Sequence, residues 1–147
     1  MRRRLTVAVT GLNATDNPGP GVSVVRALRA DESLDLRVVG LAYDAMEPGI
    51  YAQDLVDDVF LIPYPSEGVE ALEARLRQIY AQLPLDVIIP TLDAELPSFI
   101  ALAPLLEELG ARNPEEAFQA HILYSKALAL EDSNVDGDEE LSILFYR

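Results

Sequence analysis

The segment from Arg4 to Val25 constrains the fold more than any other part of this sequence. The apolar run Leu5–Thr10 is followed by Gly11 and a loop of turn-forming residues, and Pro20 then opens a stretch with helical spacing of apolar residues. A strand, a glycine-bearing loop and a helix in this order form the first unit of a parallel α/β domain. Ligands of such domains bind just beyond the carboxyl ends of the strands, so this loop is the first candidate region for a site.

Three further runs with apolar centres predict buried strands like the first. They are Asp35–Tyr43, Asp57–Pro63 and Asp86–Thr91. Between the last two, apolar residues three or four positions apart from Val69 to Leu83 predict an amphipathic helix. Ser66 is a suitable residue to cap the N-terminus of that helix.

Proline and glycine mark the ends of the later helices. Pro97 begins or kinks one helix, Pro104 interrupts it, and Gly110 is suited to its C-cap. We expect a core domain over residues 1–112, followed by a helix over 113–130. The acidic, loop-like and β-prone tail over 131–147 belongs either to the same domain or to a dimer contact.

The order of the predicted elements implies right-handed crossovers between parallel strands. The expected fold is α/β: a Rossmann-like α/β/α sandwich of three layers, whose mostly parallel sheet has four or five strands in the order of about 3-2-1-4. The run Leu141–Tyr146 either adds to the sheet edge or pairs with a second copy to give a homodimer. Asp132–Asp138 matches part of the calcium-loop pattern, but Ile143 stands where that loop needs a bidentate Glu, which favours a solvated acidic turn.

The charge balance and the composition exclude several classes of function. With 11 basic and 25 acidic residues the formal net charge is −14, which argues against nucleic-acid binding because phosphate contacts need a basic surface. No apolar run approaches the ~20 residues that span a bilayer, and the lack of cysteine excludes disulfides, thiol catalysis and Cys-based metal sites. We expect a soluble, cytoplasmic protein without membrane contact.

The glycines of the first loop do not match a nucleotide-binding fingerprint. Gly11, Gly19 and Gly21 are not spaced as G-x-G-x-x-G, and Pro18 and Pro20 lack the N–H donors that a pyrophosphate needs. NAD(P) binding is therefore disfavoured. The Gly-Lys-Ser/Thr sequence of a P-loop is absent, which excludes that class of NTPase.

Polar residues follow the first, second and fourth predicted strands, whose carboxyl ends line a common crevice in a doubly wound sheet. The candidate substrate-binding residues are Thr10, Gly11, Asn13, Asp44, Thr91, Asp93 and Glu95. The three carboxylates can receive an amine, a hydroxyl or a metal-bridged group, although each one alone is better explained as a turn or cap residue. Their convergence points to the crevice as a unit, and we assign no catalytic or metal-ligating residue.

Three stretches of the sequence carry a resemblance to a known family. They are Val9-Thr-Gly-Leu-Asn13 with the following Pro-Gly-Pro-Gly21, Asp86-Val-Ile-Ile-Pro-Thr-Leu-Asp-Ala-Glu-Leu-Pro97, and Leu105-Leu-Glu-Glu-Leu-Gly110. Together they make the region from Leu5 to Gly110 resemble the N-terminal (pre-ATP-grasp) domain of ATP-grasp enzymes. The similar branch is that of carbamoyl-phosphate synthetase large chains and carboxylate–amine ligases. Residues Pro114–Lys126 resemble the segment that leads such proteins into their ATP-binding part.

The resemblance implies a domain that binds a small carboxylate or amine substrate and packs on an ATP-grasp catalytic module in cis or in trans. In complete family members Mg²⁺–ATP is held by two later subdomains, so the chain alone is expected to bind no cofactor and to be inactive as a ligase. It is then a truncated product, an orphan domain or half of a split enzyme. The alternative is a non-catalytic small-molecule or partner-binding Rossmann-like module that dimerises through its tail.

Overall fold

The computed structural model describes residues 4–14, 19–52 and 54–111. Within these residues four strands form one parallel sheet in the order β3-β2-β1-β4, which confirms the predicted Rossmann-like α/β class and strand order. The strands are β1 (Leu5–Val9), β2 (Leu36–Ala42), β3 (Asp58–Leu61) and β4 (Val87–Ile89). The predicted helix over 113–130, the calcium-loop pattern and the β-prone tail lie outside the described residues.

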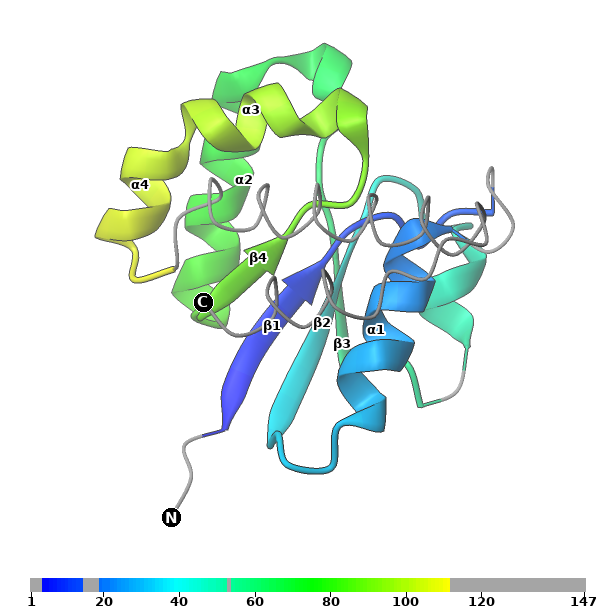
Figure 1. The fold of residues 1–147 in the computed structure, drawn as a ribbon. Coiled ribbons are helices and arrows are strands. Elements are labelled where there is room, and N and C mark those ends of the chain that lie inside the picture. The colour runs from blue at the N-terminus through cyan, green and yellow to red at the C-terminus, as the bar shows by residue number, and fades with distance from the viewer. Residues whose placement is uncertain (1–3, 15–18, 53, 112–147) are drawn as a thin grey trace, which may run out of the picture.

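Helices cover both faces of the sheet, as a three-layer sandwich requires (Figure 1). Helix α1 (Pro20–Ala30) lies on one face. Helices α2 (Val69–Gln82), α3 (Leu96–Ala101) and α4 (Ala103–Glu108) pack on the other. Each face of the sheet therefore carries its own buried apolar layer.

The alternation of side chains between the two covered faces explains why the strands are apolar at nearly every position. Val7 and Val9 of β1 pack in the cluster that contains Val22 and Val25 of α1, whereas Ala8 between them packs in the cluster on the other side. That second cluster contains the fully buried side chains Leu76, Ile79, Phe99 and Leu106. Burial of each such large side chain stabilises the fold by about 1.5–3 kcal/mol.

The start of α2 differs from the prediction, because Ser66 does not cap it. Ser66 lies inside the 3-10 turn η2 (Pro65–Glu67), and α2 begins only after Gly68, whose φ is 95°. The carboxylate of Glu67 accepts a hydrogen bond from the N–H of Tyr64 at 2.7 Å, and the N–H of Glu67 donates to the carbonyl of Tyr64 at 2.9 Å. These two bonds close a separate turn, so the positive φ of the glycine is needed before the helix can start.

The proline and glycine signals after β4 are confirmed. Pro97 lies in the first turn of α3, and Pro104 lies at the beginning of α4, so the two short helices replace one interrupted helix. Gly110 ends α4 with a φ of 94°, and its N–H donates to the carbonyl of Glu107 at 3.0 Å. This is the left-handed cap for which glycine is favoured.

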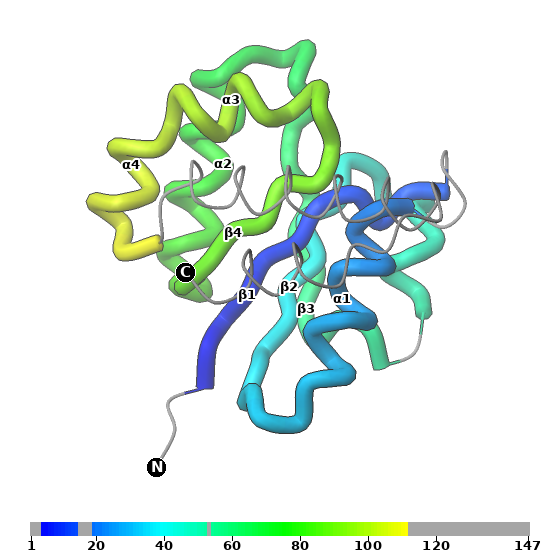
Figure 2. Tube along the Cα trace, viewed as in Figure 1, coloured from blue at the N-terminus to red at the C-terminus, as the bar shows by residue number. Residues whose placement is uncertain are grey.

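The carboxyl ends of β1, β2 and β4 lie at one edge of the sheet, as the Cα trace in Figure 2 shows. Short 3-10 turns follow two of these ends. They are η1 (Pro48–Tyr51) after β2 and η3 (Asp93–Glu95) after β4. The candidate residues predicted after the strands therefore all belong to this edge.

Candidate functional site

The carboxylate of Glu95 joins the carboxyl ends of three strands. One of its oxygens, Oε1, accepts hydrogen bonds from the hydroxyl of Thr10 after β1 and from the N–H groups of Thr91 at 2.9 Å and Leu92 at 3.1 Å after β4. The other, Oε2, accepts a hydrogen bond from the hydroxyl of Tyr43 after β2. Glu95 is only 1% exposed, so its carboxylate is shielded from solvent.

Thr10 and Thr91 add two direct bonds between β1 and β4. The N–H of Thr91 donates to the hydroxyl of Thr10 at 2.9 Å, and the hydroxyl of Thr91 donates to the carbonyl of Thr10 at 3.0 Å. Both threonines are buried. Three of the predicted site residues, Thr10, Thr91 and Glu95, therefore come together, and their polar atoms are used to hold one another.

Burial dominates the electrostatics of this junction. It raises the pKa of Glu95, while the hydrogen bonds from Thr10, Tyr43, Leu92 and Thr91 act in the opposite direction. Burial, together with the nearby Glu95 carboxylate, also raises the pKa of Tyr43 above its ordinary value. Four donors point at this one carboxyl group. An acceptor that is engaged in this way is suited to positioning the strand ends, and less suited to exchanging protons with a ligand.

Gly11 fits against this junction because it has no side chain. Its φ is 74°, and a Cβ placed on it would lie 2.0 Å from the hydroxyl oxygen of Thr91. The carbonyl of Gly11 accepts the N–H of Gly21 at 3.0 Å, and the carbonyl of Gly19 accepts the N–H of Val22 at 3.0 Å. Donors in the first turn of α1 are thus bound within the described part of the loop instead of facing a ligand phosphate.

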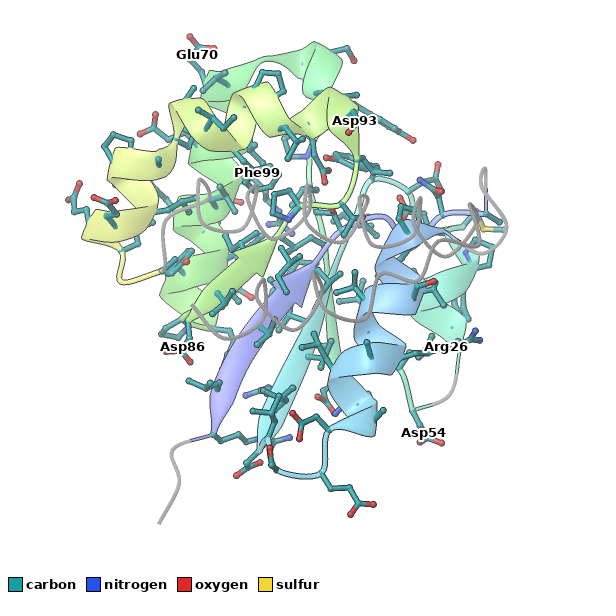
Figure 3. The ribbon with its side chains drawn as sticks, in the orientation of Figure 1. Arg26, Asp54, Glu70, Asp86, Asp93 and Phe99 are labelled. Carbon is teal, nitrogen blue, oxygen red and sulfur yellow. The ribbon has the colours of Figure 1, made fainter. Side chains whose placement is uncertain are left out.

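Asp44 and Asp93 lie at the same edge but outside the buried junction. Both are exposed. The carboxylate of Asp44 accepts the N–H of Met46 at 2.7 Å, which is the local turn that an Asp after a strand commonly makes. Asp93 is the first residue of η3, and its carbonyl accepts the N–H of Leu96. Figure 3 shows its side chain at the outside of this turn.

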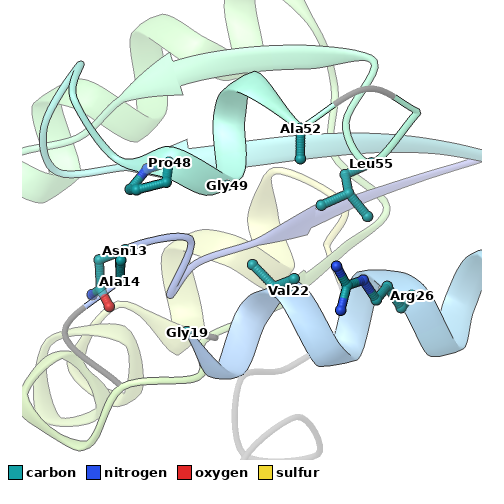
Figure 4. A pocket seen from close by; sticks show the side chains of 9 residues that line it. All are labelled: Asn13, Ala14, Gly19, Val22, Arg26, Pro48, Gly49, Ala52 and Leu55. Carbon is teal, nitrogen blue, oxygen red and sulfur yellow. The ribbon is translucent and has the colours of Figure 1, made fainter. Parts of the chain in front are cut away.

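Asn13 belongs to a different feature, a pocket of about 160 Å³ on the α1 face of the sheet. Its walls are formed by Asn13, Ala14 and Gly19 of the β1–α1 loop, by α1, and by η1 with the segment that follows it (Figure 4). Its side chains include the apolar Val22, Pro48, Ala52 and Leu55 and the polar Asn13 and Arg26. The predicted crevice thus has two parts, an edge with exposed carboxylates and a pocket with one cation.

Sequence reasoning did not select Tyr43, Glu47 or Arg26. Glu47 is 6% exposed, and its Oε1 accepts the N–H of Tyr43 at 2.8 Å, whereas its Oε2 has no hydrogen-bond partner among the described residues. Burial raises the pKa of Glu47. The ring of Tyr43 also stacks on Tyr64, with centroids 5.4 Å apart. Two of these residues had a sequence signal. Tyr43 stands at the carboxyl end of the second predicted strand. Arg26 lies four positions after Val22 and so on the same side of α1.

Among residues 4–14, 19–52 and 54–111, no group of three or more histidines or carboxylates has a geometry that could hold a metal ion. No helix in the same part of the chain is long and apolar enough to cross a membrane. No protein-family model matches this chain, and no curated protein matches it.

Proposed function

We propose that this domain is the N-terminal substrate-binding domain of an ATP-grasp-type carboxylate–amine ligase or carbamoyl-phosphate-synthetase-like protein. It holds a small carboxylate or amine substrate and leaves Mg²⁺–ATP to a catalytic module present in cis or in trans. The observation that carries the proposal is the contact between two of the stretches that resemble the family. Val9–Asn13 and Asp86–Pro97 meet at one edge of the sheet through the bonds among Thr10, Thr91 and Glu95.

The first turn of α1 supports a substrate domain over a nucleotide domain. Pro20 has no N–H, and the N–H groups of Gly21 and Val22 donate to carbonyls of their own loop. A dinucleotide-binding loop instead directs such donors at the pyrophosphate. The described part of the loop is therefore suited to a ligand without phosphates.

The exposed carboxylates supply the chemistry that an amine requires. Asp44 and Asp93 stand at the edge where ligands of open α/β sheets bind, and an ammonium group pairs with carboxylates of this kind. The buried Glu95 acts behind them as a positioning residue, since it fixes the strand ends from which both aspartates project. In this role the domain orients a substrate and performs no bond-breaking step itself.

Calorimetric titration of the full chain tests the proposal. We expect no heat from Mg²⁺–ATP and measurable heat from members of a panel of amino acids, small carboxylates and amines. The double substitution Asp44→Asn with Asp93→Asn is expected to weaken amine binding with little change in the melting temperature, because asparagine keeps an acceptor oxygen at both exposed positions. Glu107→Gln and Glu108→Gln on α4 serve as the charge-matched control. Binding of Mg²⁺–ATP by the chain alone would contradict the proposal.

A second function, that of a partner-binding module, is favoured by the edge strand β3. Val59 and Leu61 on this strand are 38% and 43% exposed, and two exposed apolar residues on an edge strand offer a surface for a partner. The predicted dimer contact through residues 131–147 lies outside the described residues and stays a prediction. Light scattering of the full chain over a range of concentrations separates a dimeric module from a monomeric substrate domain.

A further inference from the structure

The pocket on the α1 face has walls that the backbone itself holds in place. The N–H of Gly49 in η1 donates to the carbonyl of Leu12 at 2.9 Å, which fixes η1 over the end of β1. A Cβ on Gly49 would lie 2.7 Å from that carbonyl oxygen, so the approach requires a glycine. One wall is therefore attached directly to the β1 loop, and the pocket of about 160 Å³ is a built feature of the fold.

Helix α1, which forms the opposite wall, is also attached by hydrogen bonds. Arg29 of α1 donates from Nε and Nη2 to the carbonyl of Leu55 at 3.1 and 3.0 Å, and its Nη2 also lies 2.9 Å from a carboxylate oxygen of Asp57. These bonds tie the segment after η1 to α1. They place the buried side chains of Val22 and Leu55 in the lining of the pocket.

Arg26 is the cation of this pocket. Five of the six arginines in the described residues donate a hydrogen bond to a backbone carbonyl or form an ion pair with a carboxylate. They are Arg4, Arg29, Arg37, Arg75 and Arg77. Arg26 is the sixth, and within the same part of the chain no hydrogen bond or ion pair engages it. Figure 4 shows its guanidinium directed back along α1 towards Val22, below Leu55.

We propose that this pocket binds a small aliphatic carboxylate, with the carboxylate on Arg26 and the carbon chain between Val22 and Leu55. Guanidinium is the side chain that pairs best with a carboxylate, because its two N–H groups match the two oxygens. The volume lies below the ~300–1,000 Å³ of sites for drug-sized ligands, which limits the acid to a few carbons. As the acid subsite of a carboxylate–amine ligase, this assignment rests on the proposed function.

The test is an amide-resolved NMR titration of the full chain with acetate, propionate and isobutyrate, and with propionamide as the uncharged isostere of propionate. We expect shifts at Gly19, Val22 and Gly49, and tighter binding of propionate than of propionamide. Arg26→Ala should weaken propionate binding about tenfold or more, since a hydrogen-bonded charge pair is lost. The propionate affinity of Arg26→Lys should lie between those of the parent and of Arg26→Ala, because the positive charge stays while the two-pronged geometry of the guanidinium is lost.

Arg77→Ala is the control variant. Arg77 lies on α2, on the opposite face of the sheet, where it pairs with Glu73, and its removal should leave propionate binding unchanged. Ala52→Leu should fill the rim of the pocket and weaken binding while Arg26 remains. Equal binding of propionate and propionamide, or an Arg26→Ala variant that binds propionate as well as the parent does, would overturn the assignment.

The result also separates this assignment from the proposed function. Carboxylate binding that shifts only residues near Asp44 and Asp93 overturns the pocket and leaves the substrate domain standing. Propionate binding at Arg26 in a chain that binds Mg²⁺–ATP by itself supports the pocket and overturns the substrate domain. The melting temperature of Arg26→Ala checks that the variant remains folded. We expect it to equal that of the parent, because the side chain of Arg26 is exposed.

Discussion

The hydroxyl of Thr10 donates a hydrogen bond to the carboxylate of Glu95, which lies 85 residues further along the chain. Both residues are almost completely removed from solvent. The edge of the sheet at which ligands of this fold bind is thus held together by a polar contact that a ligand does not reach. A ligand at this edge has to use the exposed groups around the junction or the neighbouring pocket.

The hydroxyl of Tyr43 should contribute strongly to stability. Tyr43→Phe removes the donor to Oε2 of Glu95 and keeps the ring that stacks on Tyr64. We expect a loss of about 2 kcal/mol in the free energy of unfolding, the usual cost of a lost hydrogen bond to a buried charged group. Urea denaturation measures it. Tyr51→Phe, in which an exposed tyrosine loses its bond to the carbonyl of Ala45, should cost far less.

Glu95 and Asp93 should respond in opposite ways to truncation. Glu95→Ala leaves buried donors without their acceptor, so we expect a loss of about 3 kcal/mol or more in the free energy of unfolding. Asp93→Ala removes an exposed side chain and should cost clearly less, about 1 kcal/mol or below. Thermal and urea denaturation of the two single variants measure these losses in the free energy of unfolding. Equal stability of both variants would show that the buried junction contributes nothing to the fold.

Gly11 should tolerate no side chain, for reasons of space as well as φ. Gly11→Ala combines a positive φ with a Cβ 2.0 Å from the hydroxyl oxygen of Thr91, and we expect a loss of about 3 kcal/mol or more. Gly110→Ala is the matched control. Its φ is also positive, but no atom lies within 4 Å of the added Cβ, so only the backbone cost of about 1–2 kcal/mol should appear. If the two variants melt at the same temperature, the close approach at Gly11 is not limiting.

Glu47 should make the stability of the protein depend on pH. Burial raises its pKa in the folded state above the ordinary value of 4.5, so the folded protein holds the proton more tightly than the unfolded chain does. This contribution to stability is fully present below pH 4.5 and is lost as the pH rises through the folded pKa. Glu47→Gln keeps an acceptor for the N–H of Tyr43 and removes the buried charge.

The gain in stability from Glu47→Gln over the parent should therefore be larger at pH 8 than at pH 4. Urea denaturation at a series of pH values measures it. Glu108→Gln, at an exposed position at the end of α4, is the control and should follow the pH profile of the parent. A pH-independent difference between Glu47→Gln and the parent would mean that the carboxyl of Glu47 is not a buried charge.

The elements of the fold could be predicted well because their signals are local. Apolar runs such as Leu5–Val9 and Leu36–Ala42 are buried on both faces, and a strand in that position has to be apolar at nearly every residue. The start of α2 was missed because the turn at Glu67 depends on its side chain bonding back to Tyr64, a contact that competes with a cap at Ser66. Local propensity does not decide between two such caps.

The location of the candidate site could be predicted from the sequence, but the burial of its side chains and the contacts among them could not. The sequence alone was enough to predict that Thr10, Thr91 and Glu95 follow adjacent strands of a parallel sheet, because these polar residues come after apolar runs. The folded chain shows in addition that these side chains are buried and bound to one another, while Asp44 and Asp93 stay exposed. Burial depends on which segments pack over the strand ends, and the partners of Glu95 come from three places in the chain. No short stretch of sequence contains that information.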